Sequence, residues 1–149
     1  MESKGEIVIY QALDGQSTIV VKLENESVWL NLLQISTLFE KDKSVISRHL
    51  KNIYREGELD RRATVAKNAT VQKEGGREVT REIEYFNLDA ILSVGYRVNS
   101  IRGTQFRIWA NKVLKDYLIK GYAVNERRLQ EQSRQLEELK QTEIGRAHV

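Results

Sequence analysis

The sequence predicts an α+β fold built around a winged helix-turn-helix, with a β-hairpin before it and a helical pair and a polar, coiled-coil-like helix after it. Three observations support this prediction. Two pairs of segments have strand-like patterns, one pair as runs rich in β-branched residues and the other through alternation with a period of two, and a glycine-containing turn separates the members of each pair. Between these pairs the apolar residues recur at helical spacing, over a stretch long enough for two short helices. Two helices followed by a hairpin is the outline of a winged helix-turn-helix.

The first pair of strands is predicted near the N-terminus. Residues 7–10 and 17–22 are rich in β-branched residues, and Asp14-Gly15 between them is a turn signal. Residues 28–30, Val-Trp-Leu, can add a short third strand. These segments predict a hairpin that opens the fold.

Two short helices are predicted next. The first carries apolar residues at helical spacing, namely Leu32, Ile35, Leu38 and Phe39. The second begins at Asp42 or Ser44, either of which can cap a helix, and ends near Glu56 because Gly57 is a typical stop. Glu40 stands where the turn of a helix-turn-helix usually has glycine. A left-handed backbone is strained for glutamate, so we expect a turn longer than the standard one.

A second hairpin is predicted after these helices. Residues 63–71 and 78–86 alternate as strands do, and Gly75-Gly76 lies between them in a polar turn. This hairpin would be the wing. We therefore expect residues 1–86 to form one unit, which combines the N-terminal hairpin with a winged helix-turn-helix.

A helical pair, residues 87–124, is expected to pack on that unit. Four sequence features mark where its two helices begin and end. They are the cap Asn87, the interruption Asn99-Ser100, the cap Thr104 and the stop Gly121, which ends the second helix near Lys120.

The C-terminal part of the chain is almost wholly polar. Residues 125–142 are predicted to form a polar helix or linker, with leucines at partial heptad positions, namely Leu129, Leu136 and Leu139. Residues 143–149 read like the translation of a common sequencing adaptor. On that reading the natural chain continues beyond Thr142.

Composition excludes several classes of site. The chain has no cysteine and two histidines, so a disulfide framework or a zinc site is not expected. No glycine spacing matches a phosphate-binding loop, and no apolar run approaches the roughly 20 residues that span a bilayer. The N-terminus lacks the pattern of a signal peptide. We therefore expect a cytoplasmic protein without catalytic residues, metal, cofactor or membrane contact.

The second short helix has one apolar face and one basic face. Its apolar face holds Val45, Ile46, His49, Leu50 and Ile53. Its opposite face holds Ser44, Ser47, Arg48, Lys51 and Arg55. Seven Lys/Arg and four Asp/Glu lie between Lys41 and Arg62. This arrangement is typical of a recognition helix, whose first residues meet base edges and whose cations meet phosphates.

Within this basic face Arg48 can form two hydrogen bonds to a guanine, worth about 1–3 kcal/mol of discrimination. The predicted phosphate contacts are extended by Lys43, Arg61, Arg62 and the wing around residues 73–77. The alternative is an amphipathic surface helix with ordinary solvated charges.

A second polar cluster contains Arg97, Arg102 and Arg107. It can be a second nucleic-acid contact. It can equally be part of the packing around Trp109, with the arginines bonding the ends of helices.

Several segments resemble the RhuM family of virulence-associated proteins. They are residues 35–39, 47–53, 84–91, 94–100, 102–110 and 117–122. The resemblance spans approximately residues 4–128, and it implies a protein similar to DNA-binding proteins and encoded on pathogenicity islands or other mobile elements. Residues 106–110, with Tyr117-Leu118 beyond them, are also similar to phage antirepressor (Bro-N-like) domains, which implies a phage-related regulatory setting.

These observations predict a DNA-binding transcriptional regulator that places the helix at residues 44–56 in the major groove of double-stranded DNA. A palindromic site would require a homodimer. One alternative is an interaction or oligomerisation module of a longer protein, in which residues 125–142 drive self-association. Another is an enzyme whose catalytic part lies beyond Thr142.

Overall fold

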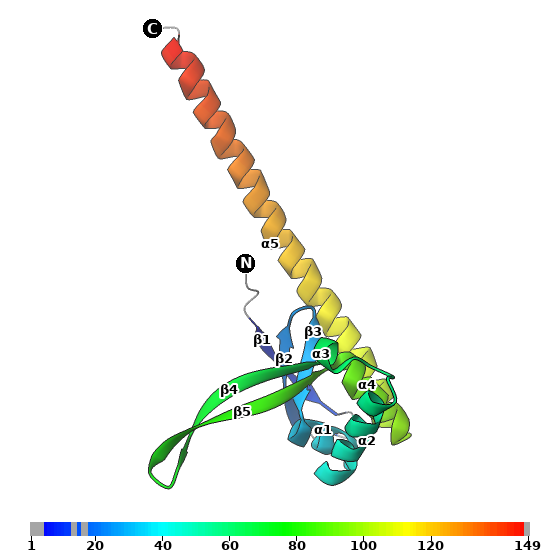
Figure 1. The fold of residues 1–149 in the computed structure, drawn as a ribbon. Coiled ribbons are helices and arrows are strands. Elements are labelled where there is room, and N and C mark those ends of the chain that lie inside the picture. Colours follow the sequence, from blue (N-terminus) through cyan, green and yellow to red (C-terminus); the bar gives the residue numbers. More distant parts are fainter. Residues whose placement is uncertain (1–4, 13–14, 16–17, 148–149) are drawn as a thin grey trace. The chain divides into compact units, whose positions relative to one another are not determined.

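The computed structural model describes residues 5–12, 15 and 18–147, with side-chain positions for all of these except 122–125 and 142–147. The chain divides into two compact units, Met1–Leu114 and Lys115–Val149. The first unit contains an open, five-stranded antiparallel sheet together with helices, so the predicted α+β class is confirmed (Figure 1).

The strands and helices alternate in blocks along the chain. In order they are β1 (Glu6–Gln11), β2 (Thr18–Glu24), β3 (Ser27–Asn31), α1 (Leu32–Phe39), α2 (Lys43–Arg55), α3 (Arg61–Thr64), β4 (Val65–Glu74), β5 (Arg77–Asn87), α4 (Leu88–Arg97) and α5 (Ile101–Ala147). The sheet order is β1-β2-β3-β5-β4, and every neighbouring pair is antiparallel. Both predicted hairpins and the short third strand are therefore present.

One face of the sheet forms the core of the first unit. Leu30 of β3 pairs with Phe86 of β5, and both are almost fully buried. Further buried members of this face are Ile19, Val21, Leu23 and Val28. The beginning of α5 packs on the same face, because the Tyr10 ring lies 5.1 Å from that of Phe106 and 4.9 Å from that of Trp109, both in edge-on contact.

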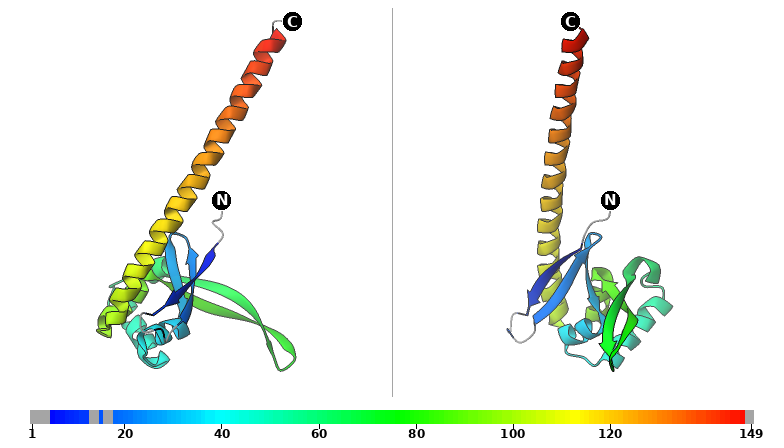
Figure 2. Two further views of the ribbon diagram at one scale, coloured as in Figure 1. Left: turned by 180° about the vertical axis from the view of Figure 1, so that it is seen from behind. Right: turned by 90° about the vertical axis from the view of Figure 1, so that its left-hand side faces the viewer.

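The hairpin of β4 and β5 is longer than the rest of the sheet. Strand β3 pairs only with residues 85–87 of β5, whereas β4 and β5 pair with each other over ten residue pairs. Figure 2 shows the free part of this hairpin extending away from β1, β2 and β3. Its turn, Gly75-Gly76, has positive φ at both residues, as a two-residue hairpin turn requires.

Side-chain caps fix where several helices begin. The Asn31 side chain accepts the Gln34 N–H at 2.9 Å, and the Gln34 side chain accepts the Asn31 N–H at 2.9 Å, which completes a capping box for α1. The predicted caps Asp42 and Asn87 begin α2 and α4. Gly57, with φ of +75°, follows α2 at the predicted place.

The turn between α1 and α2 has three residues, 40–42, so the expectation of a longer turn is wrong. Glu40 adopts the left-handed conformation (φ 53°, ψ 44°) that glycine usually provides. Its backbone N–H bonds to carbonyls of the last turn of α1. Its carboxylate lies 3.0 Å from the Arg102 guanidinium, and this ion pair offsets part of the backbone strain.

Two predicted boundaries of the last helix are also wrong. The helix α5 begins at Ile101 rather than near Thr104, and the Ser100 hydroxyl accepts the Arg102 N–H at 3.2 Å. It continues through Gly121 to Ala147, so residues 125–142 belong to the same helix as residues 101–120. Glycine inside a helix costs only about 1 kcal/mol relative to alanine, and the neighbours of Gly121 favour helix. None of the described helices combines the length and apolar character of a membrane-spanning segment.

A further short helix, α3, was not predicted. Asp60 caps it by accepting the Arg62 N–H at 3.0 Å, and β4 therefore begins at Val65 instead of residue 63. The Thr64 side chain is buried and bonds to the Asp60 carbonyl at 2.9 Å.

Candidate nucleic-acid interface

Helix α2 is held by one buried side and by its N-terminal cap. Ile46, Leu50 and Ile53 lie within the core and are at most 4% exposed. Asp42 accepts hydrogen bonds from the Ser44 hydroxyl and from the Ser44 N–H, which hold the pKa of the Asp42 carboxyl below its usual value. The helix contains four Lys/Arg and no Asp/Glu, so its cations meet no acid on the same helix.

The predicted basic face of α2 is directed away from the core. Ser44, Arg48, Lys51 and Arg55 are exposed, and Ser47 is half-buried at the edge of the face. Among the described residues, no acid forms an ion pair with Arg48 or Lys51. Arg55 donates to the Asn52 side chain at 2.8 Å, which orders the last turn. The exposed face of α2 thus carries a row of cations, with hydroxyl side chains near the N-terminal end of the helix.

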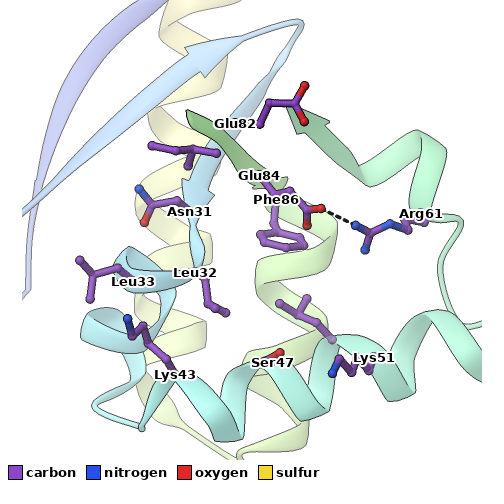
Figure 3. Close-up of a pocket in the computed structure, with 12 residues that line it drawn as sticks. Asn31, Leu32, Leu33, Lys43, Ser47, Lys51, Arg61, Glu82, Glu84 and Phe86 are labelled. Carbon is purple, nitrogen blue, oxygen red and sulfur yellow. Dashed lines mark hydrogen bonds and ion pairs between the residues drawn. The ribbon is translucent and has the colours of Figure 1, made fainter. Parts of the chain in front are cut away.

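The flank of this face opens into a cleft between α2 and the β4–β5 hairpin. The cleft has a volume of about 570 Å³. Figure 3 shows Lys43, Ser47 and Lys51 on the α2 side and Phe86 at the floor. The remaining lining residues are Asn31, Leu32, Leu33, Leu50, Arg61, Glu82, Ile83 and Glu84. Sequence reasoning missed this cleft because its walls come from four segments that only the fold brings together.

The two predicted cations of α3 differ in their surroundings. Arg61 forms an ion pair with Glu84 at 2.7 Å and lies over the Tyr54 ring, 5.7 Å from its centroid. Burial raises the pKa of the Tyr54 hydroxyl, which bonds to Thr64. Arg62 is exposed. Of these two arginines, Arg62 is therefore the better placed to meet a phosphate.

The β4–β5 hairpin is electrically neutral. Residues 65–87 contain four Lys/Arg and four Glu. Lys73 pairs across the ladder with Glu78, and Glu74 pairs with Arg77. Arg81 also donates two hydrogen bonds to the Glu74 carboxylate, at 2.8 and 2.7 Å. The predicted contribution of residues 73–77 to phosphate binding thus lacks the excess of positive charge found on α2.

The second arginine cluster is divided by the fold. Arg97 lies 2.6 Å from Glu56 and 3.4 Å from Glu58, and its side chain is only 20% exposed. Arg102 is similarly covered and pairs with Glu40. These two arginines pair with acids at the C-terminal ends of α2 and α1. Arg107 is exposed on α5, where a nucleic-acid contact stays a prediction.

His49 lies beside Arg48 and Arg97 on the flank of α2. Burial, together with these two positive charges, lowers the pKa of its imidazole. Within the described residues, no group of three His, Asp or Glu side chains is arranged to hold a metal ion.

Comparison with known proteins assigns the family. A sequence model described as the virulence protein RhuM family matches residues 63–144, more than half of the chain. The chain belongs to the RhuM family. No curated protein and no solved structure matches it.

The RhuM match covers the β4–β5 hairpin, α4 and nearly all of α5, but neither α1 nor α2. Arg97 and Arg102 therefore lie inside the family segment, whereas their partners Glu40, Glu56 and Glu58 lie outside it. The basic face of α2 is thus an argument from geometry and charge, separate from the family assignment.

Proposed function

We propose that the chain is a sequence-specific DNA-binding protein, a transcriptional regulator associated with mobile elements, that docks α2 in the major groove. The observation that carries this proposal is the exposed face of α2, with Ser44 and Arg48 near the helix start and Lys51 and Arg55 further on. A recognition helix contacts base edges through its N-terminal residues and phosphates through its flanking cations.

The order of the elements around α2 supports a winged form of the helix-turn-helix. Strand β3 leads into α1 and α2, and the β4–β5 hairpin follows, with β5 returning to the centre of the sheet beside β3. A three-residue turn joins the two helices, as in helix-turn-helix motifs. Because the hairpin is neutral, its proposed role is to fit the shape of the duplex beside α2 and not to neutralise phosphates.

The charges of α2 set the expected salt dependence. Lys43, Lys51 and Arg55 are the proposed phosphate contacts, and Arg48 is the proposed base contact. With Arg62 of α3 as a fourth phosphate contact, the slope is about −3.6 per chain in a plot of log K against log salt concentration.

The proposal is tested by selecting duplexes from a random library and measuring binding by fluorescence anisotropy at several salt concentrations. Arg48→Ala should weaken binding to the selected site by about 5- to 150-fold, with a much smaller effect on a scrambled duplex. Lys51→Ala should weaken both complexes about equally and reduce the salt slope by about 1. Lys112→Ala removes one exposed charge of α5 and serves as the charge-matched control. The proposal is contradicted if the affinity changes neither with salt concentration nor with Arg48→Ala. It is also contradicted if the selection enriches no sequence from the library.

A second candidate function is favoured by the C-terminal part of α5. Leu129, Leu136 and Leu139 are 63%, 55% and 64% exposed on an otherwise polar helix. Polar single helices gain little stability without a partner, so this stretch can serve an interaction module through self-association. Light scattering of a chain truncated before Asn125 tests this candidate, because an unchanged oligomeric state removes the argument for it.

A further inference from the structure

Strand β1 has apolar side chains on both faces. The run Ile7-Val8-Ile9-Tyr10 has no polar alternation, which is typical of a strand covered on both sides. Tyr10 faces the core and is 3% exposed, whereas Ile7 and Ile9 on the opposite face are 71% and 65% exposed. The described residues of the chain thus cover only one of the two apolar faces of β1.

The exposed side chains of β1 form one patch with the next strand. Ile9 pairs with Val20 of β2, which is 50% exposed, and Ile7 pairs with Lys22. A shallow cavity of about 380 Å³ lies beside them, lined in part by Ile7, Val20 and Tyr85. We call Ile7, Ile9 and Val20 the β1 patch. Contiguous exposed apolar side chains of this kind mark interaction surfaces.

Strand β1 is also an edge strand. It stands first in the sheet order, and its ladder with β2 runs over six consecutive pairs without a bulge. No other strand among the described residues pairs with its outer side. Edge strands are usually protected by proline, lysine or a bulge, and the sequence Glu-Ile-Val-Ile-Tyr-Gln has none of these. The edge and the β1 patch therefore present backbone and apolar groups to the same partner.

We propose that β1 and the β1 patch form an interface between two copies of this chain, in which the two β1 strands pair antiparallel about a two-fold axis at Val8. A two-fold axis perpendicular to the sheet makes the two edges antiparallel and keeps equivalent faces on the same side. With the axis at Val8, Ile7 of each copy lies opposite Ile9 of the other. The two patches then join into one continuous apolar surface.

The charges around the patch favour a second copy as the partner. Lys22 and Glu24 border it and form an ion pair at 3.2 Å, so the border carries no net charge. Two such surfaces meet without like-charge repulsion, and a nucleic acid gains no attraction from them. This interface does not depend on DNA binding by α2 and is tested separately from it.

The absence of cysteine from the sequence allows a direct test in this chain without truncation. Directly opposed residues of antiparallel strands have Cα atoms about 4.5–5.5 Å apart, within the range of a disulfide. Val8→Cys should therefore give a covalent dimer on mild oxidation or with a short bismaleimide. Val71→Cys is the matched control, because Val71 is an exposed strand valine (66%) outside the patch. Equal cross-linking rates for the two variants overturn the proposal.

Light scattering with and without Ile9→Lys provides the second measurement. The unaltered chain should show a mass of about twice 17.3 kDa at high concentration. Ile9→Lys should raise the dimer dissociation constant at least about tenfold, because it places a charge without a partner opposite Ile7 of the other copy, inside the apolar surface. Leu136→Glu in α5 should leave the Val8→Cys cross-link intact. If Leu136→Glu abolishes the dimer and Ile9→Lys leaves it unchanged, the chain associates through α5 and the proposal is wrong. The proposal is also wrong if the chain is strictly monomeric, or if the β1 patch binds a different protein.

Discussion

Replacing Gly95 by alanine tests how closely α4 and α5 must approach. Gly95 lies against Gly103, and the Phe39 ring of α1 covers the same point. A Cβ atom at Gly95 would lie 2.9 Å from Phe39 Cζ and 3.3 Å from the Gly103 Cα. The first distance is shorter than real contacts allow, so either the ring or the helix has to shift.

The expected effect is the difference between two opposing contributions. Alanine stabilises a helix interior by about 1 kcal/mol relative to glycine. Overpacking a filled core costs about 1–3 kcal/mol. Phe39 is only 3% exposed and cannot swing into solvent, and the second neighbour is backbone, so the cost falls in the upper part of that range. We expect Gly95→Ala to lower the free energy of unfolding by about 1–2 kcal/mol, with a fall in Tm of about 3–8 °C.

Urea denaturation of four variants, namely Gly95→Ala, Phe39→Leu, the two combined and Gly121→Ala, makes this measurement decisive. Gly121→Ala is the control, because Gly121 lies inside α5 with nothing within 4 Å of an added Cβ, and it should not destabilise the chain. Gly95→Ala combined with Phe39→Leu should lose less stability than the sum of the single changes, since the smaller side chain makes room for the methyl group. If Gly95→Ala is as stable as the unaltered chain, the close packing of these helices around Phe39 is wrong.

Three further predictions concern local structure. Asn25 and Glu26 both have positive φ in the β2–β3 turn, so Glu26→Gly, which creates the favoured Asn-Gly turn, should raise the free energy of unfolding by about 1 kcal/mol in urea denaturation. Asn31→Ala removes the capping box of α1 and should lower that free energy by about 1 kcal/mol, whereas Asn31→Asp should retain most of it. Burial lowers the pKa of His49 below its usual 6.5, so the unfolded chain binds more protons between that lowered value and 6.5. The free energy of unfolding should therefore rise with pH across this window, and an unchanged slope in His49→Gln would refute this.

Much of the fold follows from local chemistry that a sequence displays. The caps Asp42 and Asn87 were predicted because a short polar side chain before an apolar repeat satisfies the free N–H groups of the first turn. The turn at Gly75-Gly76 was predicted because both positions need positive φ. Such features depend on a few consecutive residues, and they fixed both hairpins and the starts of α2 and α4.

Features that depend on distant residues were not predicted. Nothing near Glu40 in the sequence indicates that Arg102, sixty-two positions later, will pair with it in a left-handed turn. The neutralisation of Arg61 by Glu84 likewise depends on how α3 and β5 pack. The end of α5 was misplaced because Gly121 lies in open space, where a helix can continue at modest cost. The basic face of α2 could therefore be predicted from the spacing of nearby residues. Which of the other cations form ion pairs depends on the fold and could not be predicted.

The ion pairs of Arg97 bear on the electrostatics of α2 as well as on its packing. Glu56 and Glu58 follow the last turn of α2, where two free carboxylates would weaken the positive field of the proposed interface. Arg97 pairs with both and holds the pKa of the Glu56 carboxyl below its usual value. It also places a positive charge at the C-terminal end of α2, where the helix dipole favours one. A residue of the segment that matches the RhuM family thus both fixes the end of α2 and compensates the acids nearest to it. Loss of Arg97 should therefore weaken the proposed DNA binding through α2 in the fluorescence anisotropy assay, even though Arg97 is not one of the proposed DNA contacts.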